Sequence, residues 1–131
     1  MGGLSLALRM FHHDEVDFSR WVFTGLVNGS QYIQDEVDWE QLNALGTNVG
    51  ATYRQLPNAE EQAGFRQSFI ARIAQGFRKE KGRAEDFINW RLQERGDGMV
   101  VVAADYPAKR KTLLLHVSTI GSKRLTGIQW Q

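Results

Sequence analysis

The last third of the chain alternates apolar runs with short turn-forming stretches, a pattern typical of an antiparallel sheet. Four runs follow one another, at 88–93, 99–104, 112–119 and in the segment that ends at Trp130. In the first run Ile88, Trp90 and Leu92 alternate with polar residues, which indicates one apolar face. The second run is apolar on both faces and is predicted to be an interior strand. The pattern predicts a four-stranded antiparallel meander.

The pair Gly121-Ser122 predicts a two-residue type II′ hairpin, and that turn sets the register of the last two strands. Counting outward places Leu115 opposite Ile128 and His116 opposite Gly127. One face of the hairpin is then strongly apolar, with Leu113, Leu115, Val117, Ile128 and Trp130. The other face is mixed, with Leu114, His116 and Leu125, and is expected to meet solvent or a partner.

The first two thirds of the chain carry helical periodicity instead. Leu4, Leu8 and Phe11 form one stripe, and a second stripe from Phe18 to Leu26 predicts a helix that Asn28-Gly29 ends. Asp38 and Gln41 resemble a capping box, so a short helix is expected through Leu45. A further short helix is expected over 48–56.

Asn58, with Glu61 three residues later, predicts the start of a long helix over 59–80 that Lys81-Gly82 ends. Its apolar stripe contains Phe65, Phe69, Ile70, Ile73 and Phe77, and Arg66, Arg72, Arg78 and Lys79 fall outside the stripe. We expect this helix to cover the apolar face of the sheet. The chain is therefore predicted to be one α+β domain over 1–131, mainly helical over 1–83 and antiparallel sheet over 84–131.

Composition narrows the class of protein. With 131 residues and 42% hydrophobic content the chain is expected to fold, and no apolar run approaches the roughly 20 residues that span a bilayer. The run from Leu4 to Leu8 is too short for a secretory signal. Residues 1–50 hold seven acidic and two basic side chains, a charge of −5, and residues 51–131 hold eight acidic and fourteen basic ones, a charge of +6. No basic-aromatic motif accompanies this asymmetry, so nucleic-acid binding is not predicted.

Several short motifs occur in an order that resembles a known superfamily. They are Val37-Asp38-Trp39, Leu45-Gly46, Tyr53-Arg54, the helix start from Asn58 to Phe69 with Gln62 and Phe65, and the strand pair Leu115-His116-Val117…Gly121…Leu125…Ile128. This order resembles the nuclear-transport-factor-2-like (cystatin-like α+β) superfamily, and within it the periplasmic phospholipid-carrier proteins of the Mla lipid-transport system. Such carriers usually have a tryptophan soon after the last hairpin, where this chain has Arg124-Leu125. The resemblance implies a periplasmic location if a signal peptide has been removed, and the cytoplasm is expected otherwise.

The resemblance also implies a cone with a pocket between the sheet and the helices. We expect this pocket to bind an apolar small molecule or a lipid, without a cofactor or a metal, through aromatic and aliphatic side chains. The expected ligand-binding residues are Trp21, Phe65, Phe69, Ile73, Phe77, Trp90 and Leu115. These side chains also suit a plain core. Two alternatives stay open: a non-catalytic dimerisation domain, and a small-molecule enzyme of the isomerase or dehydratase kind.

Candidate catalytic and metal-binding residues have simpler structural explanations. His12-His13-Asp14-Glu15 lacks the i, i+4 spacing of a helical metal site and suits a polar helix end. His116 stands alone on a strand. Asp38 suits a helix cap and Asp105 a strand end. The basic stretches 109–111 and 123–124 lie at opposite ends of one strand and form no single patch.

The apolar run 99–104 and the mixed face around Leu114, His116 and Leu125 together predict a homodimer through the sheet. The alternative is that the N-terminal helices fold back over the same face within one chain.

Overall fold

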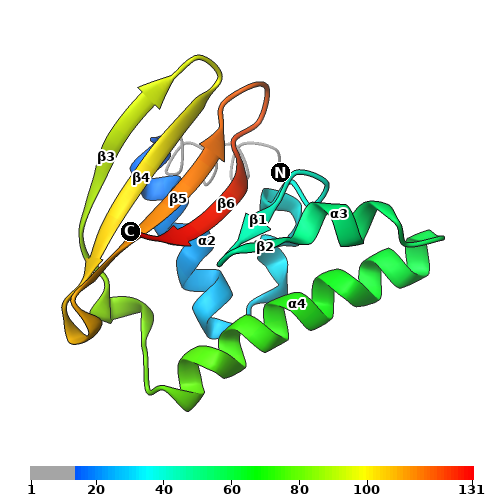
Figure 1. Ribbon diagram of the computed structural model, residues 1–131, viewed down its shortest axis with the longest axis horizontal. Coiled ribbons are helices and arrows are strands. Elements are labelled where there is room, and N and C mark those ends of the chain that lie inside the picture. The colour runs from blue at the N-terminus through cyan, green and yellow to red at the C-terminus, as the bar shows by residue number, and fades with distance from the viewer. Residues whose placement is uncertain (1–13) are drawn as a thin grey trace, which may run out of the picture.

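The computed structural model describes residues 14–131. Its three α-helices are α2 (Glu15–Asn28), α3 (Val49–Arg54) and α4 (Ala59–Lys79), and its 3₁₀ helices are η1 (Gln31–Glu36), η2 (Ala84–Asp86) and η3 (Pro107–Lys109). The strands are β1 (Asn43–Ala44), β2 (Thr47–Asn48), β3 (Ile88–Gly96), β4 (Met99–Tyr106), β5 (Lys111–Ser118) and β6 (Arg124–Trp130). They form one sheet in the order β2-β1-β6-β5-β4-β3 (Figure 1). The α+β class is confirmed.

The sheet is larger than the sequence predicts and is mixed. The predicted antiparallel meander is present as β3 to β6, but β1 adds to it in parallel beside β6, and β2 pairs antiparallel with β1. The predicted helix from Asp38 to Leu45 is therefore wrong. In its place the Asp38 N–H donates to the carbonyl of Leu125 and the Leu45 N–H to that of Ile128, so this segment satisfies its backbone by joining the sheet.

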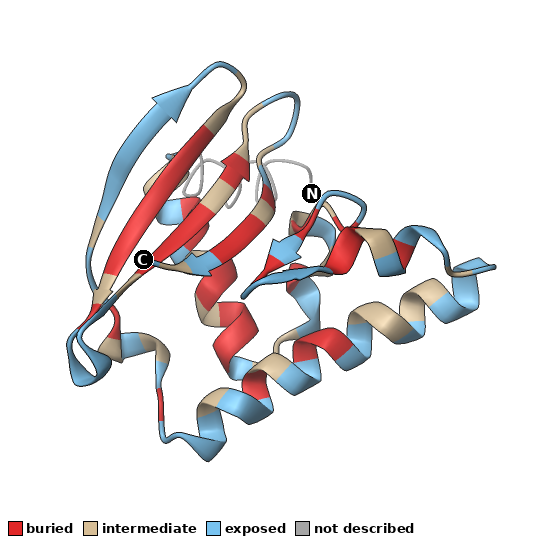
Figure 2. Cartoon of the chain, in the orientation of Figure 1, coloured by how far each residue is buried: buried red, intermediate tan, exposed pale blue. Residues whose placement is uncertain are grey.

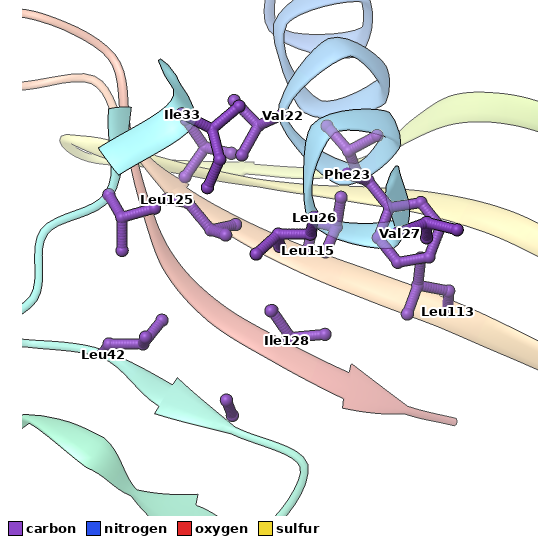
Figure 3. Packing of buried hydrophobic residues seen from close by; sticks show 14 of the residues in the cluster. Val22, Phe23, Leu26, Val27, Ile33, Leu42, Leu113, Leu115, Leu125 and Ile128 are labelled. Atoms are coloured by element: carbon purple, nitrogen blue, oxygen red, sulfur yellow. The ribbon is translucent and has the colours of Figure 1, made fainter. Parts of the chain in front are cut away.

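The helix that covers the sheet is α2, whereas the sequence analysis assigned this position to the helix over 59–80. Val22, Phe23, Leu26 and Val27 of α2 pack against Leu113, Leu115 and Ile128 of the strands (Figure 3). Helix α4 packs against α2 and η1, on the side of α2 that points away from the sheet (Figure 1). The face of the sheet that meets α2 is called the inner face below, and the opposite face, which carries Leu114 and His116, the outer face.

Helix ends follow the predicted local signals. Asp14 caps α2, and Gly29 ends it in a left-handed conformation with φ 72°. The Asn58 side chain accepts the Glu61 N–H at 2.8 Å and caps α4 as predicted. The stripe formed by Leu4, Leu8 and Phe11 lies outside the described residues, as do His12 and His13.

The last hairpin departs from the predicted register at the end next to its loop. Leu115 pairs with Ile128 and His116 with Gly127 as predicted, but an irregularity after His116 pairs Val117 with Leu125. The connection between β5 and β6 is a five-residue loop, 119–123, and not a two-residue turn. Leu125 therefore belongs to the inner face, where it is buried, and not to the mixed outer face.

Strand β3 is the exposed edge of the sheet (Figure 2). Asn89 has a positive φ of 57° within an irregularity between Ile88 and Arg91, and this breaks the predicted alternation. Trp90 packs against the core, while Ile88 and Leu92 are exposed. No helix within residues 14–131 combines the length and apolar character that crossing a membrane requires.

Candidate functional site

An apolar groove of about 490 Å³ opens between helix α4, helix α3 and the β1–β2 hairpin. We call it the α3–α4 groove. Helix α4 contributes Phe65, Phe69, Arg72 and Ile73, and the opposite wall consists of Ala44, Leu45, Thr47, Val49 and Thr52. Its size falls within the range of about 300–1,000 Å³ that is usual for small-molecule sites.

Helical spacing explains why four side chains of α4 reach the groove together. Residues 65, 69, 72 and 73 stand at i, i+4, i+7 and i+8, so they lie on one face of the helix. Arg72 was predicted to fall outside the apolar stripe, and it is exposed, but it lies at the edge of the same helix face and borders the groove.

A cluster of aromatic rings supports the groove from behind. Trp39 meets Phe69 edge to face with ring centroids 5.5 Å apart, and Tyr53 lies 5.9 Å from Phe65. Trp39 and Tyr53 are themselves 6.1 Å apart. Aromatic pairs at these separations attract one another beyond simple area burial, so the two phenylalanine rings have restrained positions.

Arg66 of α4 forms hydrogen bonds with η1 and with α3 beside this cluster. Its Nε donates to Oε1 of Gln34 and its guanidinium donates to the Tyr53 hydroxyl, both at 2.8 Å. The Gln34 carbonyl also accepts the Trp39 indole N–H at 2.9 Å. Because Gln34 lies in η1 and Tyr53 in α3, these bonds hold both elements to α4 and fix the width of the groove.

The opposite wall depends on a close backbone approach at the start of α3. A Cβ on Gly50 would collide with the carbonyl of Glu40, and the Gly50 N–H donates to the Leu42 carbonyl at 2.9 Å. Arg54 donates to the same Glu40 carbonyl at 2.8 Å. Helix α3 is therefore fastened to the chain that leads into β1, which sets the position of Val49 and Thr52.

Arg72 is the charged member of the groove lining. Its side chain is exposed, and within residues 14–131 it has no hydrogen-bond or ion-pair partner. The neighbouring Arg66 is committed to Gln34 and Tyr53, so the two arginines of this helix segment have different roles.

The structure brings together three of the seven expected ligand-binding residues, Phe65, Phe69 and Ile73. The other four do not line this groove and pack elsewhere in the core. Phe77 and Trp90 lie beside Phe23, with ring centroids 5.7 and 5.9 Å from it, and the Trp21 ring lies tilted against the Tyr32 ring at 5.1 Å. Leu115 is fully buried in the sheet. They were grouped with the site because α4 was expected to lie directly on the sheet.

A second hollow of about 620 Å³ lies on the outer face and is lined by polar and apolar surface in about equal parts. Its lining includes Asp38, Gln41, Asn43, His116, Ser118, Thr126 and Gln129. His116 lies against Gly127 as its predicted register implies, and no hydrogen-bond partner for its buried Nε2 exists in the described chain. His116 therefore lies outside the space between sheet and helices.

The remaining candidate residues have structural roles. Asp14 caps α2, and Glu15 pairs with Arg95 at 3.2 Å, a hydrogen bond that lowers the pKa of the Glu15 carboxyl. Asp38 is not a helix cap, because residues 39–41 form only a turn and the chain then enters β1. Lys111 of the first basic stretch lies over the Trp130 ring at 5.3 Å.

Comparison with protein-family models, with curated proteins and with solved structures finds no match. The resemblance to the nuclear-transport-factor-2-like superfamily and to the Mla carriers stays a prediction, and the assignment of function rests on the geometry above.

Proposed function

We propose that the protein binds an apolar small molecule or a lipid in the α3–α4 groove. The observation that carries this proposal is the groove itself, which exposes parts of Phe65 and Ile73 to a space of about 490 Å³. Each methylene of a ligand that is buried there would contribute roughly 0.8 kcal/mol to binding.

The way the groove is built also suits binding. Arg66 and the aromatic cluster hold its walls before any ligand arrives, so little conformational freedom is lost on association. A role as a lipid carrier, which the resemblance implies, is the narrower form of the same proposal. It requires that the ligand be released as well as bound.

The two alternatives lack a comparable observation. The described residues bring Asp38 and His116 to one hollow, but the Nε2 atom of His116 is buried and has no hydrogen-bond partner among them, so the two side chains form no acid-base pair. The dimerisation alternative depends on the outer face and not on the α3–α4 groove.

The proposal is tested by filling the groove. Thr52 is exposed on α3 and lines the groove, so Thr52→Trp should place an indole where the ligand would lie. We expect the variant to lose affinity for dodecan-1-ol, a neutral apolar probe, by at least about tenfold in calorimetric titration. Gln55→Trp, one residue beyond the end of α3 and outside the groove, is the matched control and should bind as the wild type does.

Native mass spectrometry of protein purified from cells complements this titration. A co-purifying apolar molecule that is absent from Thr52→Trp supports the proposal. A wild-type protein that binds neither a cellular molecule nor dodecan-1-ol contradicts it.

A further inference from the structure

We infer that the ligand of the α3–α4 groove is a single-chain amphiphile with an anionic head group, whose charge pairs with Arg72. The inference rests on the proposed function and names the class of ligand. It depends on three features: the position of Arg72, the absence of a competing partner in the described chain, and the size of the groove.

Arg72 stands where the head group of such a ligand would lie. It is one residue from Ile73 and three from Phe69, both of which give apolar surface to the same groove. The residue is exposed, which fits a charge at the edge of the apolar space and not beneath it. A chain that lies on Phe65, Phe69 and Ile73 can therefore end beside a cation.

Nothing described in the structure neutralises this cation. Arg72 has no carboxylate or carbonyl partner within residues 14–131, and the other groove-lining residues are uncharged. Two of them, Thr47 and Thr52, carry hydroxyl groups that can donate to an oxyanion. A guanidinium binds carboxylate or phosphate oxygens through paired N–H groups, which a neutral head group cannot match.

The volume limits the number of chains. A methylene group occupies about the volume of one water molecule, roughly 30 Å³, so a chain of about twelve carbons needs roughly 360 Å³. The groove of about 490 Å³ accepts one such chain. Two chains would need roughly 720 Å³ and would leave much apolar surface in water. The inference thus departs from the two-chain phospholipid that the resemblance to carriers implies.

The test compares two probes that differ only in their head groups. Dodecanoate and dodecan-1-ol are titrated, below the micelle concentration of dodecanoate, into the wild type, Arg72→Gln and Arg78→Gln. Arg78 is an exposed arginine of the same helix that does not line the groove, which makes it the matched control. Circular dichroism and a thermal melt check that each variant is folded.

We expect Arg72→Gln to weaken dodecanoate binding about tenfold, to leave dodecan-1-ol binding unchanged and to remove the preference for the acid. Arg78→Gln should match the wild type with both probes. Added salt should weaken dodecanoate binding to the wild type more than to Arg72→Gln. Dodecyl phosphate, run in parallel, shows whether the groove prefers a carboxylate or a phosphate head.

The outcomes separate the inference from the proposal beneath it. If dodecan-1-ol binds the wild type and dodecanoate binds no tighter, or if Arg72→Gln weakens both probes equally, the anionic head group is wrong while the apolar site stands. If a two-chain phospholipid binds tightly at a ratio of one, the single-chain part is wrong. If neither probe binds the wild type, the proposed function itself fails.

Discussion

Asp105 joins three strands through one carboxylate. Its Oδ2 accepts the Asn89 amide at 3.1 Å, and its Oδ1 accepts Arg91 at 3.1 Å and the Thr112 hydroxyl at 3.4 Å. Asn89, with φ 57°, lies within the irregular part of β3, and Arg91 is the residue at which regular pairing resumes. The carboxylate therefore holds the conformation that moves Ile88 and Trp90 out of simple alternation.

This carboxylate predicts a pH-dependent contribution to stability. The hydrogen bonds from Asn89 and then Arg91 lower the pKa of Asp105 below its ordinary value. Its contribution to the free energy of unfolding is therefore complete above the pKa of the unfolded chain, about 4, and is lost as the pH falls through the lower folded pKa. Asp105→Asn should lower the urea midpoint at neutral pH, and the gap from the wild type should close in strong acid.

A matched variant isolates this effect. Asp97→Asn changes an aspartate in the turn between β3 and β4 that lacks this set of partners, and it should shift the midpoint less. A gap between the wild type and Asp105→Asn that is equal at neutral and strongly acidic pH would show that the charge of Asp105 is not responsible.

At the scale of elements, Gly25 controls how closely η1 approaches α2. A Cβ on Gly25 would collide with the Ile33 side chain and would lie 3.3 Å from the Tyr32 hydroxyl. Gly64, in α4, has open space at the same position. Substitution by alanine is therefore expected to change stability in opposite directions at these two helical glycines.

We predict that Gly25→Ala destabilises the protein although alanine is the better helix former. The gain in helix propensity, about 1 kcal/mol, is outweighed because Ile33 is fully buried and must move. Gly64→Ala should instead stabilise the protein by about 0.5–1 kcal/mol. Thermal unfolding measures both changes, and a rise in melting temperature for Gly25→Ala would refute the close packing of η1 on α2.

Elements with local signals were predictable, and elements created by pairing were not. The cap at Asn58 and the stop at Gly29 need only their neighbours in sequence, and both were predicted. Strands β1 and β2 have two residues each and exist because β6 lies beside them, so no periodicity reveals them. From sequence alone, Asp38 and Gln41 fit a capping box. Only the pairing of β1 with β6 excludes the helix that such a box would start.

The site divides in the same way. Phe65, Phe69 and Ile73, which line the groove, belong to the apolar stripe predicted on α4. The helical spacing of Arg72 also places it on this face, but its charge excluded it from an apolar stripe. The opposite wall, with Val49 and Thr52, depends on the contact of Gly50 with Glu40, which sequence spacing does not show. Trp21, Phe77 and Trp90 do not line the groove, because α2 and not α4 meets the sheet; both helices are amphipathic, and only packing decides which one does so.

At the scale of the whole molecule, one core runs from the inner face of the sheet through α2 to α4. Leu115→Ala should therefore lower the free energy of unfolding by about 2–5 kcal/mol, since Leu115 is fully buried in the middle of the sheet. Phe69→Ala should lower the free energy of unfolding by less than the same substitution at a fully enclosed phenylalanine, because the space it leaves joins the α3–α4 groove. Ile120→Ala, at a side chain that is 78% exposed, should change stability by less than about 0.5 kcal/mol.

The homodimer through the sheet stays a prediction, and the structure changes the reason for it. The prediction assumed that Leu114 and Leu125 would be exposed to water on the outer face. In the structure Leu125 lies on the inner face and Leu114 is buried. What still favours pairing is that, within residues 14–131, the helices lie on one side of β3–β6 and the outer face carries none (Figure 1).

Leu114→Glu would not separate dimer from monomer, because a charge there would be buried within one chain and would unfold it. Gln129 is the better position, since it pairs with Leu114 across β5 and β6 but is exposed. In an isologous pair Gln129→Arg would bring like charges to both copies of the interface, so the sedimentation mass should move from dimer to monomer with the melting temperature kept. Gln75→Arg, at an exposed position of helix α4, adds the same charge away from the sheet and should leave the dimer intact. A wild-type protein that sediments as a monomer at tens of micromolar would end the prediction. The apolar residues Val101, Ala103 and Leu114 of the outer face are already buried within one chain, so a monomer would leave none of them in water.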